Sequence, residues 1–147
     1  MEAFNVNQTI EKVKSQMRKG ILEYCILLIL HQREAYSADI IRILQESKLI
    51  IVEGTLYPLL SRLKNLGLLS YSWVESTQGP PRKYYKITEK GDYFLTHLND
   101  AWLEISHAVE DLSRRDFPAL PAQEYISVSE PIDTIQNDEK DHSDQPL

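Results

Sequence analysis

The stretch EGTLYPLLSRLKNLG, from Glu53 to Gly67, decides the fold and carries an unusual surface. Its leucines recur at helical spacing and predict one face that packs on a core, formed by Leu56, Leu59, Leu60, Leu63 and Leu66. A solvated helix face is usually rich in Lys and Glu. The opposite face of this helix instead holds Thr55, Tyr57, Pro58, Ser61, Arg62 and Asn65. Two interpretations fit: these residues merely end and solvate a core helix, or they contact another molecule.

Four more elements are expected upstream. Apolar spacing predicts a short amphipathic helix over Thr9–Met17, a weak point at Gly20 and a core helix from Ile21 to about His31. A further helix follows, for which Ser37 is a suitable N-cap because its hydroxyl can accept from a free backbone N–H. The β-branched run Ile50–Val52 fits a brief strand.

Downstream of Gly67 the sequence predicts a β-hairpin. Aromatic and β-branched residues lie on both sides of a turn signal at Gln78–Pro81. Arg82 and Lys83 follow the two prolines directly, so we expect two cations at the tip of a stiffened loop.

The clearest periodicity of the chain lies after the hairpin. Thr88 can cap a helix from about Glu89 to Arg115, which would be roughly 40 Å long. Apolar residues follow one another at spacings of three and four along it, as in a coiled-coil seam: Leu95, Leu98, Trp102, Ile105, Val109 and Leu112. A stripe of this length exceeds what a small domain covers, so the sequence predicts a homodimer with this seam as its interface.

Charge is distributed unevenly along the chain. The formal net charge is −6, yet residues 1–98 carry thirteen Lys/Arg against ten Asp/Glu, whereas residues 99–147 carry three against twelve. The acidity therefore belongs to the C-terminal third, and the first part is mildly basic, which permits phosphate binding. We expect a DNA-binding domain over residues 1–88, a dimerisation helix over 89–115 and an acidic disordered tail over 116–147.

Several function classes lack support. No nucleophile with a base and an orienting acid, no phosphate-cradling glycine loop and no metal cluster is recognisable, so we expect no enzyme, no cofactor and no metal. Cys25 is the single cysteine, which excludes an intrachain disulfide. The longest apolar run is far shorter than a membrane span and no secretory signal is recognisable, so a cytoplasmic protein is expected.

The order of three helices followed by a basic hairpin is that of a winged helix-turn-helix, in a mainly α fold with a small β-hairpin (α+β). In such arrangements the third helix enters the major groove of DNA. We therefore expect DNA contacts from Thr55, Tyr57, Pro58, Ser61, Arg62 and Lys64 of the helix and from Arg82 and Lys83 of the hairpin. The alternative is a winged-helix module that binds other proteins and never touches DNA.

Three stretches together resemble the PadR family of bacterial transcriptional regulators. They are MRKGILEYCILLIL from Met17, EGTLYPLLSRLKNLGLL from Glu53 and GPPRKYYKITEKG from Gly79. The resemblance covers about Met17 to Leu112 and implies a winged helix with a C-terminal dimerisation region. It also implies repression by operator binding, relieved by a small molecule. The single long helix resembles the smaller subfamily.

Trp102 stands where Leu or Ile would pack most simply. In some small PadR-like repressors a tryptophan at the corresponding place lines an interface pocket that sandwiches flat aromatic compounds. The resemblance thus implies a planar aromatic effector as a possible ligand. A large interface anchor without any ligand is the other interpretation.

Overall fold

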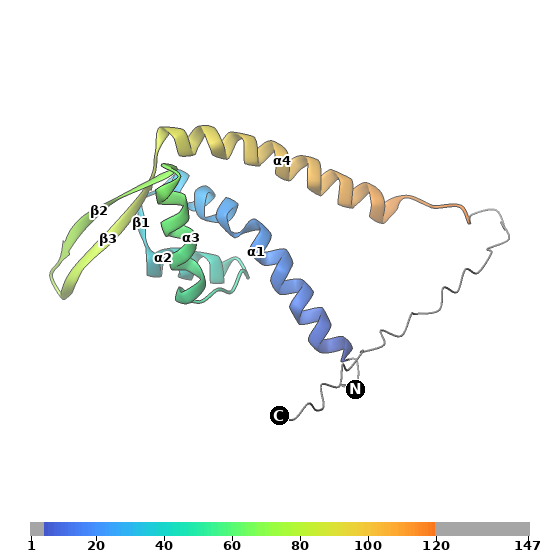
Figure 1. The fold of residues 1–147 in the computed structure, drawn as a ribbon, viewed down its shortest axis with the longest axis horizontal. Helices are drawn as coiled ribbons and strands as arrows, with labels where there is room; N and C mark the ends of the chain where they lie inside the picture. Colours follow the sequence, from blue (N-terminus) through green and yellow to red (C-terminus); the bar gives the residue numbers. More distant parts are fainter. Residues whose placement is uncertain (1–4, 120–147) are drawn as a thin grey trace, which may run out of the picture. The chain divides into compact units, whose positions relative to one another are not determined.

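A computed structural model describes residues 5–119 of the chain. Within these residues the elements are α1 (Val6–Gln32), β1 (Ala35–Tyr36), α2 (Ser37–Glu46), α3 (Glu53–Asn65), β2 (Leu69–Ser76), β3 (Gly79–Ile87) and α4 (Glu89–Arg114) (Figure 1). This order of helices and strands is the predicted winged helix followed by a long helix. Residues up to Arg114 form one compact unit, and the predicted tail lies, from residue 120 onward, outside the described residues.

The first helix is longer than its sequence pattern indicates. The two helices predicted on either side of Gly20 are one helix, α1, of 27 residues. A mid-helix glycine costs only about 1 kcal/mol relative to alanine, and the apolar second half of α1, which packs in the core, offsets that cost. Asn5 caps the helix, because its side-chain oxygen accepts from the backbone N–H of Gln8 at 3.2 Å.

The core lies where α1, α2 and α3 meet the sheet. The leucine face predicted for α3 is confirmed at Leu56, Leu60 and Leu63, which are fully buried. The same buried cluster contains Leu22, Ile26, Leu27, Leu30, Ala35, Ile40, Leu44, Ile51, Leu68, Leu69, Tyr85 and Leu95. With α3 fixed on its leucine side, its polar side remains exposed.

Two local predictions upstream of α3 are wrong. The segment Ile50–Val52 forms no strand, since no neighbouring strand pairs with it, and only Ile51 is buried. Ser37 begins α2 but does not cap it; its hydroxyl lies 3.1 Å from the hydroxyl of Tyr57 on α3 instead. The Ser37 hydroxyl thus contacts Tyr57, 20 residues away, and not a backbone N–H of its own helix.

The sheet is antiparallel with strand order β1-β3-β2. The hairpin of β2 and β3, here called the wing, pairs Trp73 with Lys83 and Tyr71 with Tyr85, and its turn is Thr77–Gln78. The turn therefore comes earlier than predicted, and Arg82 and Lys83 lie within β3 rather than at the tip. The third strand, β1, was not predicted, because two residues are too short for a recognisable pattern.

Thr88 connects the wing to α4. As predicted, its hydroxyl caps the helix by accepting from the N–H of Gly91 at 3.0 Å, and it also donates to the carbonyl of Gly67 at 2.7 Å. Gly67 ends α3 with a φ of +76°, a conformation that favours glycine. The end of α3, the base of the wing and the start of α4 are thus joined at one point.

Candidate nucleic-acid interface

Helix α3 exposes two flanks that meet different neighbours. Tyr57, Ser61 and Lys64 lie on the flank toward the wing, where they line hollows shared with wing residues. Thr55 and Arg62 lie on the other flank, toward α1. The residues that the sequence grouped on one face are therefore divided between two surfaces.

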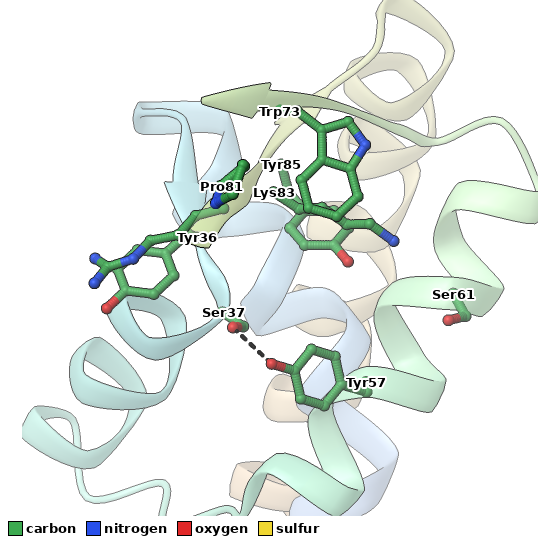
Figure 2. Close-up of a pocket in the computed structure, with 9 residues that line it drawn as sticks. Tyr36, Ser37, Tyr57, Ser61, Trp73, Pro81, Lys83 and Tyr85 are labelled. Atoms are coloured by element: carbon green, nitrogen blue, oxygen red, sulfur yellow. Dashed lines mark hydrogen bonds between the residues drawn. The ribbon is translucent and has the colours of Figure 1, made fainter. Parts of the chain in front are cut away.

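A groove separates α3 from the wing (Figure 2). This wing groove is lined by Tyr36, Ser37, Tyr57, Ser61, Trp73, Pro81, Arg82, Lys83 and Tyr85, and we include in it the adjoining hollow, which shares Ser61, Lys83 and Tyr85 and adds Leu60, Lys64, Asn65 and Tyr71. Figure 2 shows the ring of Tyr57 held at one side by its hydroxyl contact with Ser37. Trp73 is 62% exposed on the opposite wall, although an indole of this size usually lies in a core. An exposed aromatic beside cations is typical of a binding surface.

The cations of the groove lie over aromatic rings and not beside carboxylates. Lys83 Nζ is 4.5 Å from the ring centre of Tyr71 and 5.2 Å from that of Trp73. Lys64 Nζ, from α3, lies 5.6 Å from the same Tyr71 ring. The guanidinium of Arg82 lies 4.8 Å from the ring centre of Tyr36. The rings hold these cations in place without neutralising them, so they remain available to an anion.

Tyr85 forms the floor of the groove and is 7% exposed. Burial, and to a smaller extent the neighbouring Tyr57 and Tyr71, raise the pKa of its phenol above the usual value. Its hydroxyl therefore stays protonated at neutral pH and can donate a hydrogen bond to an acceptor that enters the groove.

Arg62 points to the other flank of α3. Its guanidinium donates to both carboxylate oxygens of Glu23 on α1, and this hydrogen bond and the opposite charge raise the pKa of Arg62 further above its usual value. A single nitrogen makes both contacts, so part of the guanidinium remains unused. In this conformation Arg62 is directed toward α1 rather than toward the wing groove.

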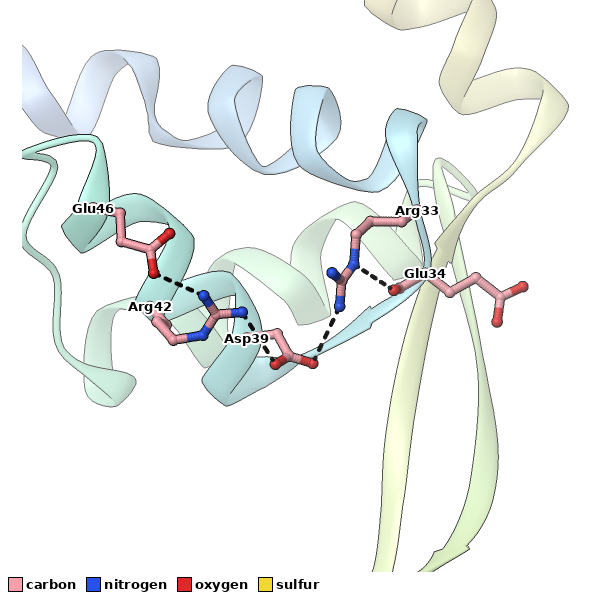
Figure 3. A network of polar contacts seen from close by, with 5 residues as sticks. All are labelled: Arg33, Glu34, Asp39, Arg42 and Glu46. Carbon is pink, nitrogen blue, oxygen red and sulfur yellow. Dashed lines mark hydrogen bonds and ion pairs between the residues drawn. The ribbon is translucent and has the colours of Figure 1, made fainter.

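The cations around α2 are also paired (Figure 3). Arg42 lies 2.7 Å from Glu46 and 3.8 Å from Asp39, and Arg33 lies 3.9 Å from the second oxygen of Asp39. We call these four side chains the α2 charge cluster. Its two positive and two negative charges cancel, so it presents little net attraction to a phosphate.

Comparison with known proteins identifies the class of molecule that presents this surface. Residues 26–97 match the model of the transcriptional regulator PadR-like family. A PadR-like transcription factor from Bacteroides fragilis is 64% identical, with 69% of this chain and 98% of that chain covered and a TM-score of 0.59. A PadR-like transcriptional regulator from Bacillus cereus is 36% identical, with 69% and 99% covered and a TM-score of 0.62.

This chain belongs to the PadR-like family of transcriptional regulators. It is therefore a DNA-binding regulator and not an enzyme, in agreement with the sequence-based expectation. An uncharacterized protein from Lysinibacillus sphaericus is also similar, at 27% identity over 101 residues, which are 67% of this chain and 93% of that protein. The wing groove and α3 of this PadR-like chain combine exposed cations with hydrogen-bonding groups.

The predicted dimer seam has two parts in this structure. Leu95 is buried within its own chain and Leu98 packs against the same core. Trp102, Ile105, Val109 and Leu112 are exposed along the remainder of α4. The ring of Trp102 lies 6.3 Å from that of Tyr24 on α1, whose hydroxyl donates to Asn99 at 2.7 Å. One side of this indole is thus supported while 41% of the residue stays exposed.

Sequence reasoning missed much of the wing groove, above all Tyr36, Ser37, Tyr71, Trp73, Pro81 and Tyr85. A signal for three of them was present, because residues two apart on paired strands share a sheet face. Tyr71 and Trp73 of β2 thereby join Lys83 and Tyr85 of β3 on the face next to α3. Tyr36 and Ser37 gave no comparable signal, since they depend on the short strand β1.

Neither a metal-binding cluster nor a membrane-spanning helix occurs within residues 5–119. No group of three His, Cys, Asp or Glu side chains there is arranged to hold a metal ion. None of the described helices is both long enough and apolar enough to cross a membrane. Cys25 is half-buried against the core, and burial raises the pKa of its thiol. These observations leave the α3 and wing surface as the candidate site.

Proposed function

We propose that this PadR-like chain is a cytoplasmic, sequence-specific repressor that binds its operator as a homodimer and is released by a small molecule. The observation that carries the proposal is the set of uncompensated cations in the wing groove. Lys64 and Lys83 reach toward the same ring from opposite walls of the groove. A polyanion that follows the groove gains from both cations without having to displace a carboxylate.

Each predicted residue has a role in this proposal. Tyr57 and Ser61 contact base edges in the major groove, and Lys64, Arg82 and Lys83 contact the phosphate backbone beside it. Arg82 or Lys83 can also enter the adjacent minor groove. Thr55 and Pro58 complete the outer surface of α3. Arg62 reads a base or phosphate with the part of its guanidinium that Glu23 leaves unused.

Dimerisation through α4 is the second part of the proposal. The exposed apolar residues Trp102, Ile105, Val109 and Leu112 require cover, and a second copy of α4 supplies a stripe of the same spacing. Replacing Ile105 and Val109 together by glutamate is expected to give a monomer in analytical ultracentrifugation. A variant that remained dimeric would contradict this interface.

The effector is proposed to be a planar aromatic compound that stacks on Trp102. The indole is exposed on one side and supported by Tyr24 on the other, which suits stacking. Trp102→Ala is expected to keep DNA binding but lose release by the compound. If the compound releases the variant as well as the wild type, the effector lies elsewhere.

A gel shift with DNA from upstream of the protein's own gene tests the central claim. The wild type should shift this DNA in preference to unrelated DNA of equal length. Substituting Arg82 and Lys83 by glutamine should weaken binding broadly and flatten its salt dependence. The matched control replaces Arg33 and Arg42, an equal loss of charge from the α2 charge cluster, and should bind almost normally. Equal effects of the two variants would contradict the proposed surface, and the absence of any salt-sensitive shift would favour a protein-binding module.

A further inference from the structure

A second basic hollow lies on the opposite flank of α3. This α1 cleft is lined by Ser15, Arg18, Lys19 and Leu22 of α1, by Ile50, Ile51 and Val52 of the preceding loop and by Thr55 of α3. It is therefore built from the middle of the first helix and the start of the recognition helix, two segments that are about 35 residues apart in the sequence. Arg18, Lys19 and Ser15 have no part in the proposed function.

The two cations of the cleft are uncompensated. Among the described residues, no carboxylate forms an ion pair with Arg18 or Lys19, and neither cation has any other recorded polar contact. Two other charged residues of the same helix do have partners, because Lys14 pairs with Glu11 at 3.0 Å and Glu23 pairs with Arg62. The charge of the cleft is thus free, whereas Lys14 and Glu23, one on either side of it along α1, are each paired.

We propose that the α1 cleft binds backbone phosphates of the DNA strand opposite to the one that follows the wing groove. This inference rests on the proposed function, since it assumes that α3 enters a major groove. An α-helix with side chains is about 10–12 Å across and the major groove is about 12 Å wide, so each flank of an inserted helix faces one strand. The wing supplies cations on one flank, and α1 supplies them on the other.

The neutralisation of Arg62 explains why α1 has this role. Arg62 is the cation of α3 itself on this flank, and Glu23 already accepts from it. Arg62 therefore adds little net positive charge on this side, and the unpaired cations nearest to it in the cleft come from α1. Arg18 and Lys19 line the same cleft as Thr55, whose hydroxyl can donate a hydrogen bond to the same DNA backbone. The first helix thereby becomes part of the DNA-binding surface.

Salt dependence of DNA affinity tests this assignment. Each lost phosphate contact reduces the slope of log K against log salt by about 0.9, so substituting Arg18 and Lys19 by glutamine should reduce it by nearly two for each protomer bound. The matched control replaces Lys12 and Lys14, which removes the same charge from the same helix outside the cleft. A slope change equal to that of the control would overturn the proposal. Circular dichroism melts check that both variants fold, and Arg18→Glu with Lys19→Glu provides a second, stronger variant.

Ethylation interference locates the contacts strand by strand. In the wild type, ethylated phosphates on both strands of a half-site should block binding. Loss of Arg18 and Lys19 should abolish interference on one strand only, and Lys64→Gln with Lys83→Gln should abolish it on the other. Unchanged interference in the cleft variant would overturn the inference while leaving the proposed function intact. If the groove variant also retained full binding, the proposed function itself would fail.

Discussion

The α2 charge cluster and the wing groove both contain basic side chains, but these are paired with carboxylates in the cluster and unpaired in the groove. Arg33 and Arg42 each face a carboxylate, whereas Arg82 and Lys83 face aromatic rings. A carboxylate neutralises a cation, while a ring fixes its position and leaves its charge. The formal net charge of −6 therefore says little about DNA binding in this chain. What matters is whether a given cation has an acidic partner.

The largest loss of DNA affinity is expected when a carboxylate is placed in the wing groove. Tyr71→Glu puts a carboxylate beneath both Lys64 and Lys83, and we expect operator affinity to fall about 100-fold, because two charge-assisted contacts of about 1.5 kcal/mol each are lost. Fluorescence anisotropy with labelled operator DNA measures the change. Tyr71→Gln, which removes the ring without adding charge, should lose much less, and equal losses would mean that the ring itself makes the contact.

Removing one cation from the groove should have a smaller effect. Lys83→Gln is expected to lower affinity about tenfold, for the loss of one such contact. Lys86 offers a control on the same strand, because it lies on the opposite sheet face and approaches Glu34 at 4.0 Å. Lys86→Gln should leave the same titration within about twofold. A larger loss from Lys86 would mean that a cation beside a carboxylate, on the sheet face that it shares with Arg82, contributes as much as the free cations, which would contradict the proposal.

Glu23→Gln converts a paired cation into a free one. The change releases Arg62 from its carboxylate partner, so we expect affinity for random DNA to rise about threefold and discrimination of the operator to fall. Competition titrations with operator and random DNA measure both quantities. Arg62→Gln combined with Glu23→Gln should cancel the gain, and a gain that persists in the double variant would have another origin.

Removing one ion pair from the α2 charge cluster should have the smallest effect on stability and on DNA affinity. Arg42→Gln removes an exposed pair between residues four apart in a helix, which is worth about 0.3–0.5 kcal/mol. The melting temperature should therefore fall by only about 2 °C. A loss of DNA affinity above about twofold would show that the cluster is not electrostatically silent.

Sequence patterns predicted the elements that repeat and missed those that depend on remote partners. The leucines of α3 and the aromatic residues of the wing recur at regular spacing, so their elements could be recognised. Gly20 suggested a break that packing of α1 overrides. The pairing of Arg62 with Glu23, 39 residues away, has no local signature, and the same holds for Ser37 with Tyr57. The type of site could thus be predicted from sequence, but not the direction in which Arg62 points.

The junction at Thr88 joins the wing rigidly to α4. Only one residue separates β3 from α4, and Gly91 is so close that a Cβ there would lie 2.2 Å from the carbonyl oxygen of Leu68. Thr88 holds Gly67 at the end of α3 as well. Because the link is this short and closely packed, we expect α4, about 39 Å long, and the base of the wing to move together. A tilt of α4 would therefore displace the wing. In Gly91→Ala the added methyl group would push the start of α4 away from Leu68 and so change the angle between α4 and the wing.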